Sequence, residues 1–140
     1  MEEFVRKLED FARHRNAKSC SRSELETLSV VGIDSIPDAY LQFLLVAGHG
    51  VDDFLVGSDV TIDELEGVRE AADELLMEGG LAPLPRSAFV FSMHQGYQFY
   101  FFAGSEVFYY REGMSHVEKR FGSFEEFFDS VVAALNGKTS

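Results

Sequence analysis

A proline followed by apolar residues at helical spacing fixes one helix in the middle of this chain. Pro37 loses no backbone hydrogen bond in a first turn and its φ is already near the helical value, so we expect a helix to begin at or beside it. Apolar side chains that recur every three or four residues then line one helical face. Those side chains are Ile36, Tyr40, Phe43, Leu44 and Ala47. Gly48 is predicted to end the helix as a left-handed cap.

Four further helices are predicted from the same periodicity and from capping boxes. In a capping box, a Ser or Thr hydroxyl and a Glu carboxylate bind backbone N–H groups that the start of a helix leaves unpaired. The candidate boxes are Ser23-x-x-Glu26, Thr61-x-x-Glu64 and Ser123-x-x-Glu126. The predicted helices cover residues 4–12, 23–31, 61–78 and 123–135. We expect Asn136-Gly137 to end the last of them.

Short apolar and aromatic runs predict the strands of an antiparallel sheet. Gly96 can take the positive φ that a short hairpin loop needs, and strands joined by such short connections run antiparallel. The predicted strands cover residues 54–56, 89–93, 97–102, 107–111 and 117–121. We therefore expect residues 1–140 to form one α+β domain, with a mainly antiparallel or mixed central sheet packed by about four to five helices.

Aromatic side chains on both faces of one strand leave two interpretations open. Alternation along the strand puts Phe99 and Phe101 on one face and Tyr100 and Phe102 on the other. Helices can cover both faces, as for a central strand. If one face is open instead, Tyr100 and Tyr110 are natural anchors for a protein partner, because tyrosine buries a large area at low entropic cost.

The net charge of −12 arises from the middle of the chain. Residues 23–85 contain fourteen acids and one base, Arg69, which gives this stretch a charge of −13. Such a surface repels phosphate, so direct nucleic-acid binding is disfavoured and a basic partner is attracted. Plain solvation of outer helix faces is the alternative interpretation. The candidate partner-binding acids are Asp52, Asp53, Asp59, Asp63, Glu64, Glu66, Glu70, Asp73 and Glu74.

The sequence carries no recognisable catalytic motif, and no cofactor or metal is predicted. Only His49, followed by Asp52 and Asp53, forms a local cluster of possible proton-transfer groups. The alternative interpretation makes His49 a turn residue between two glycines and the aspartates solvated loop charges.

A cytoplasmic location is expected from the cysteine count and the start of the chain. Cys20 is the single cysteine, so an internal disulfide is impossible, and we interpret it as an unreactive thiol. The first residues are acidic where a signal peptide is basic, and no apolar run approaches the roughly 20 residues that a membrane span needs. Direct membrane association is therefore not expected.

The middle helix and the end of the chain together resemble the SUKH superfamily, which includes the Smi and Knr cell-wall regulators of fungi and many small bacterial proteins. That family combines a Gly, an apolar-Pro pair, an aromatic residue and a Phe-Leu pair on one helix with a Gly-rich turn and a closing helix. The matching positions are Gly32, Ile36-Pro37, Tyr40, Phe43-Leu44, Gly48, Gly50 and residues 123–128.

This resemblance implies a protein-binding function. Bacterial members are often immunity proteins, which bind and neutralise a toxin, and many toxin domains are basic nucleases that an acidic surface would attract. The first alternative is a regulatory interaction module like the fungal members. The second is a small hydrolase that uses His49 with Asp52 or Asp53.

Overall fold

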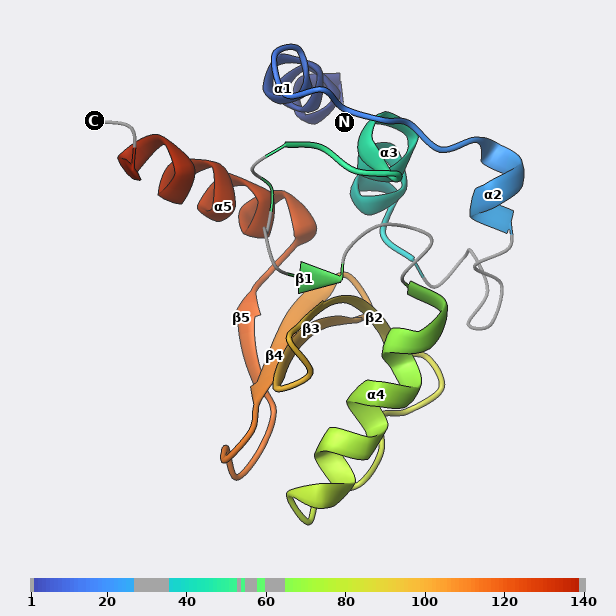
Figure 1. Cartoon of the computed structure of the whole chain (residues 1–140), viewed down its shortest axis with the longest axis vertical. Coiled ribbons are helices and arrows are strands. Elements are labelled where there is room, and N and C mark those ends of the chain that lie inside the picture. The colour runs from blue at the N-terminus through green and yellow to red at the C-terminus, as the bar shows by residue number, and fades with distance from the viewer. Residues whose placement is uncertain (1, 27–35, 53, 55–57, 60–64, 139–140) are drawn as a thin grey trace.

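Over the residues that the structure describes, the fold is α+β, with five helices and a sheet of consecutive antiparallel strands (Figure 1). The computed structural model describes residues 2–26, 36–52, 54, 58–59 and 65–138. The helices are α1 (Glu2–Ala12), α2 (Arg22–Glu26), α3 (Asp38–Ala47), α4 (Leu65–Glu78) and α5 (Phe124–Lys138). The strands are β1 (Ser58–Asp59), β2 (Phe89–His94), β3 (Gln98–Ala103), β4 (Glu106–Arg111) and β5 (Glu118–Phe121).

Each strand of the sheet pairs with its neighbour in sequence. The order is β1-β2-β3-β4-β5 and every pairing is antiparallel, which confirms the antiparallel alternative of the sequence prediction. Strand β1 contributes only two residues at one edge. The turn between β2 and β3 holds Gln95 at φ 50° and Gly96 at φ 79°, the two positive values that a type I′ hairpin requires.

A register irregularity interrupts the pairing of β2 with β3 at an aromatic residue. Between Val90 and Ser92 the pairing with β3 slips by one residue, so Phe91 is added to the strand. Phe91 stacks on Phe102 at 4.3 Å between ring centroids, and Phe89 stacks on the same ring at 6.4 Å.

One face of the sheet is covered by α3 and α5. The Tyr40 ring of α3 lies 5.2 Å from Phe102 of the sheet and 5.3 Å from Phe124 of α5. Phe127 of α5 packs on Tyr100 at 4.9 Å. Helix α1 lies behind these two helices and packs against α3, and Figure 1 shows the three gathered on one side of the sheet.

Helix α4 covers the other face of the sheet and packs mainly on β2. Phe99, Phe101 and Tyr110 are buried on this face, at 1%, 3% and 0% exposure. Tyr110 extends under the end of α4, because a Cβ built on Gly79 would come 2.5 Å from its hydroxyl oxygen. Helices thus cover both faces of β3. The prediction of Tyr110 as an exposed partner anchor is wrong, since no part of this side chain is accessible.

Two predicted helix signals are corrected by the structure. Helix α2 is capped by Ser21 and Glu24 rather than by Ser23 and Glu26: Glu24 N–H donates to Ser21 Oγ at 3.1 Å, and Ser21 N–H donates to Glu24 Oε1 at 2.9 Å. Gly48 follows α3 in a right-handed conformation, φ −61° and ψ −24°, and is not a left-handed cap. A glycine is required there by space.

Other boundaries also differ from the prediction. Helix α5 continues to Lys138, past the expected stop at Asn136-Gly137. Phe54 is buried in a bend, and the rest of the strand predicted at 54–56 lies outside the described residues. The Thr61 capping box and the second half of the helix predicted at 23–31 lie outside them as well.

The Tyr40 hydroxyl provides a test of this core. It is buried without a hydrogen-bond partner among the described residues, and burial raises its pKa. An unsatisfied buried hydroxyl costs about 1–3 kcal/mol, so we expect Tyr40→Phe to raise the free energy of unfolding by about 1 kcal/mol, measured by urea denaturation. The control Tyr109→Phe removes a hydroxyl that donates to Gln98 and should lower it by about 1 kcal/mol. A destabilised Tyr40→Phe protein contradicts this account of the core.

Candidate functional site

The outer face of α4 carries a row of exposed carboxylates. Glu70, Glu74 and Glu78 are exposed and follow one another at intervals of four residues, which places them along one side of the helix. Like charges at this spacing repel one another and weaken a helix by a few tenths of a kcal/mol per pair. Met77 lies among them with 62% of its side chain exposed. We call these four residues the acidic face.

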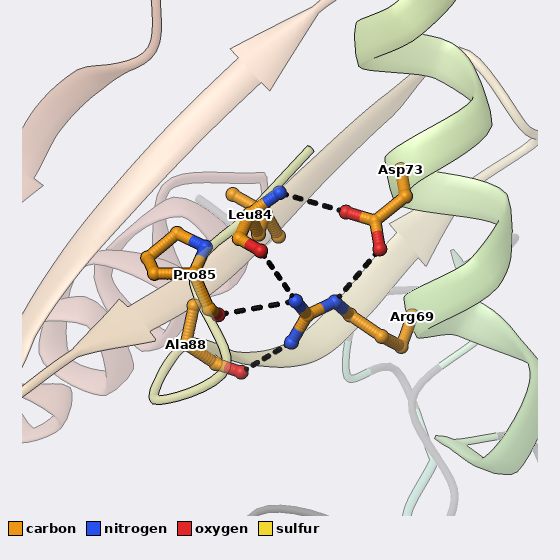
Figure 2. A network of polar contacts seen from close by, with 5 residues as sticks. All are labelled: Arg69, Asp73, Leu84, Pro85 and Ala88. Carbon is orange, nitrogen blue, oxygen red and sulfur yellow. Dashed lines mark hydrogen bonds and ion pairs between the residues drawn. The ribbon is translucent and has the colours of Figure 1, made fainter. Parts of the chain in front are cut away.

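Arg69, which precedes Glu70 in the sequence, is engaged inside the fold. Arg69 Nε donates to Asp73 Oδ2 at 3.1 Å, one turn along the same helix. Its terminal nitrogens donate to three backbone carbonyl oxygens of the linker, the segment 81–88 that connects α4 to β2. These carbonyls are Leu84 at 2.7 Å, Pro85 at 3.1 Å and Ala88 at 2.8 Å (Figure 2).

Asp73 also holds this segment, and we call the contacts of Arg69 and Asp73 with residues 84–88 the clamp. Its Oδ1 accepts a hydrogen bond from the Leu84 N–H at 2.8 Å, while its Oδ2 binds Arg69 (Figure 2). The two side chains are only 27% and 26% exposed. Asp73 therefore fixes the segment 81–88 to α4. Its carboxylate is not available to a partner, contrary to the sequence prediction. Arg69, held by these contacts, is not available to pair with the glutamates of the acidic face.

Among the described residues, the remaining predicted acids do not form one continuous band. Asp52 is exposed, but its N–H donates to the Arg15 carbonyl, so it lies beside the 13–18 loop rather than on α4. Asp53, Asp63 and Glu64 lie outside the described residues, as do the side chains of Asp59 and Glu66. The structure brings together only Glu70, Glu74 and the neighbouring Glu78, which the prediction had omitted from its list.

Tyr100 retains part of its predicted accessibility. Its ring packs on Tyr109 and Phe127 at 4.9 Å each, and its side chain is half-buried beside α5. Burial is the main cause that raises the pKa of its hydroxyl, with the neighbouring Tyr109 adding to the effect. Tyr100 lies on the opposite face of the sheet from α4, so it cannot share a small binding surface with the acidic face.

Among the described residues, the carboxylate of Glu24, which the hydrolase hypothesis did not name, lies beside His49. His49 Nε2 lies 2.5 Å from Glu24 Oε2, which joins the end of α3 to α2. The pKa of Glu24 is lowered, first by the Ser21 N–H that it accepts and then by the His49 hydrogen bond. Asp53, one of the two expected partners, lies outside the described residues.

Cys20 is adjacent to this pair but is a poor nucleophile. It is 6% exposed, and burial together with the nearby Glu24 carboxylate raises the pKa of its thiol. A neutral, buried thiol reacts slowly because the thiolate is the reactive form. Its sulfur explains Gly48: a Cβ there would lie 2.8 Å from Cys20 Sγ and 2.6 Å from the Leu44 carbonyl oxygen.

The described part of the chain holds neither a metal-binding cluster nor a membrane-spanning helix. In that part, no group of three or more His, Cys, Asp or Glu side chains is arranged to hold a metal ion. None of the helices described there has the length and apolar character needed to cross a bilayer.

The clamp was missed at the sequence level, although a signal for it exists. Arg69 is the only base in residues 23–85, and it has an acid four residues later, the spacing of an intrahelical ion pair. The contacts with backbone carbonyls of residues 84–88 had no sequence signal, because any residue supplies a carbonyl.

Comparisons of the chain with protein-family models, with curated proteins and with solved structures found no match.

The clamp predicts that Arg69 cannot be replaced by lysine. Lysine keeps the charge but lacks the planar fork of donors, so it cannot bind Asp73 and the linker carbonyls together. We expect Arg69→Lys to lower the free energy of unfolding by about 2 kcal/mol, measured by chemical denaturation. The control Arg86→Lys changes an exposed arginine of the same linker and should stay within about 0.5 kcal/mol of the wild type. Equal effects of the two substitutions contradict the clamp.

The lowered pKa of Glu24 gives the protein a specific acid sensitivity. A carboxylate with a depressed folded-state pKa stabilises above its unfolded pKa, here about 4.5, and this stabilisation is lost as the pH falls through the lower folded-state value. We expect Glu24→Gln to be less stable than the wild type at pH 7, with the difference shrinking below about pH 4.5. Thermal melts from pH 3 to 7 measure this. The same substitution at the exposed Glu26 is the control, and a difference that is constant with pH argues against the assigned cause.

Proposed function

We propose that this chain is a non-catalytic binding protein that neutralises a toxin domain with a basic surface, and that it acts in the cytoplasm. The observation that carries the proposal is the acidic face. Three glutamates are exposed along one side of α4, and Arg69, the one arginine of this helix, is held by Asp73 and the linker carbonyls. Solubility alone is served equally well by mixed charges, so a concentrated negative surface has another use.

The chemistry of such a surface suits an inhibitor of a nuclease. Aligned carboxylates attract a basic protein over several ångströms and raise its association rate, particularly at low salt. They also occupy the groups that would otherwise bind the phosphates of nucleic acid. The resemblance to the SUKH superfamily supports the same interpretation, because its bacterial members are often immunity proteins.

Coexpression with a toxin domain encoded beside this gene tests the proposal. The chain should restore growth, and the purified pair should form a 1:1 complex in calorimetry. We expect the triple substitution Glu70→Lys, Glu74→Lys and Glu78→Lys to weaken the complex by about tenfold or more at low salt and to reduce its salt dependence.

A matched triple substitution separates local from global charge. Glu9→Lys, Glu26→Lys and Glu112→Lys make the same change in net charge at exposed positions outside α4, and should weaken the complex by less than about threefold. Equal effects of the two triples mean that the acidic face is not the contact surface. Failure to restore growth with any neighbouring toxin domain argues against immunity.

A further inference from the structure

A pocket of about 390 Å³ lies between the second half of α1 and the middle of α5. The rings of Phe11 and Phe128, whose centroids lie 5.3 Å apart, and the half-buried Val132 form its apolar part. Charged side chains of both signs complete the lining. The volume falls within the range of sites that take a small ligand. Helices α1 and α5 lie on the side of the sheet away from α4, so this pocket is separate from the acidic face (Figure 1).

Arg15 lines the pocket as a half-buried cation that pairs with no carboxylate among the described residues. Its Nη1 donates to the Phe11 carbonyl oxygen at 3.0 Å, whereas its Nε is buried and has no hydrogen-bond partner among those residues. A carbonyl dipole does not neutralise a guanidinium, and a charge held partly out of water is costly until an opposite charge pairs with it. Arg15 is therefore stabilised by an anion in the pocket.

The other charges of the lining already have partners. Lys7 Nζ lies 3.4 Å from Asp129 Oδ2, and both residues line the pocket. Asp10 Oδ1 lies 3.1 Å from Arg13 Nη2. The described lining thus holds one positive charge without an opposite one, that of Arg15. A ligand with a single negative charge balances it, whereas a doubly charged phosphate places a second negative charge beside Asp10 and Asp129.

The Arg15 guanidinium is held in place before a ligand arrives. Its Cζ lies 4.3 Å from the centroid of the Phe11 ring, in a cation–π contact. In the backbone, Arg15 N–H donates to the Ala12 carbonyl at 3.1 Å, and Asp52 N–H donates to the Arg15 carbonyl at 2.7 Å. A cation fixed by side-chain and backbone contacts binds an anion with little ordering cost.

The charge of the surrounding segment favours an anion although the whole chain is acidic. Residues 1–22 contain six bases and four acids, in contrast to the fourteen acids and one base of residues 23–85. At physiological salt, exposed charges more than about 8–10 Å away are largely screened, so the nearby bases dominate the field in the pocket. The net charge of −12 therefore does not exclude an anionic ligand here.

We propose that this pocket binds a small organic monocarboxylate with an apolar body. The carboxylate accepts from Arg15 Nη2, a donor that binds no other described residue. The apolar body packs on Val132 and against the rings of Phe11 and Phe128, which removes apolar surface from water. The inference does not depend on toxin binding, because the pocket and the acidic face lie on opposite sides of the sheet.

Three small probes test the pocket in methyl NMR of the full chain. The first is 3-phenylpropanoate, the second is its uncharged amide, and the third is inorganic phosphate. We expect 3-phenylpropanoate to shift the methyl signals of Val132 with a dissociation constant of about 1 mM or tighter. The amide and phosphate should bind about tenfold more weakly or not at all. Absence of a Val132 shift with 3-phenylpropanoate, or equal binding by the amide, overturns the proposal.

Removal of the cation supplies the second arm. Arg15→Gln deletes the charge and should weaken binding of 3-phenylpropanoate by about tenfold or more. Arg6→Gln makes the same change at an exposed position of α1 outside the pocket lining, and should change binding by less than about twofold. Equal binding by the two variants overturns Arg15 as the anion-binding group.

A pocket-filling variant keeps the test independent of Arg15. Val132→Phe places a larger side chain in the pocket and should weaken binding of 3-phenylpropanoate by about tenfold. Val131→Phe makes the same change at a half-buried position of α5 outside the lining, and should leave binding unchanged. Thermal melts establish which variants fold, and if Arg15→Gln does not, the valine pair decides. Equal binding by the two valine variants overturns the pocket as the site.

Discussion

The sheet has apolar side chains on both faces, and each face must therefore be covered. On one side this demand is met by α3 and α5, whose rings meet those of the sheet at Tyr40, Phe102 and Phe124. On the other side a single helix, α4, is available, and the linker extends its cover. The Arg69 clamp holds the linker against α4. An apolar pocket lined by Leu81, Phe101 and Phe108 lies where the cover of the linker ends.

Features set by local periodicity could be predicted from the sequence. The spacing of apolar residues beginning at Ile36 predicted α3 and its buried face, and the short loops predicted the antiparallel order of β2 to β5. Both patterns depend on residues a few positions apart, whose geometry is fixed by the element itself.

Features set by distant neighbours could not be predicted in the same way. The segment 21–26 offers two capping boxes with identical spacing, and the one used places Glu24 beside His49, a residue 25 positions later. Gly48 was correctly taken as the end of α3 but for the wrong reason, because Cys20, far away in the sequence, occupies the space of a side chain there. A similar limit applies to charge: the sequence counts acids, but only the fold shows that Asp73 is held by Arg69 whereas Glu70 and Glu74 are exposed.

The contact between α1 and α5 has a consequence for how the chain is made. Phe4 packs edge-on against Phe124 and Phe128, so these rings join the earliest and latest helices of the described fold. Strands β2 to β5, in contrast, are joined by short turns and can form hairpins as soon as each turn has left the ribosome. During synthesis, α1 can pack against α3 first, but the Phe4 ring lacks its Phe124 and Phe128 neighbours until α5 has emerged, and an apolar ring left uncovered in this interval favours aggregation or chaperone binding.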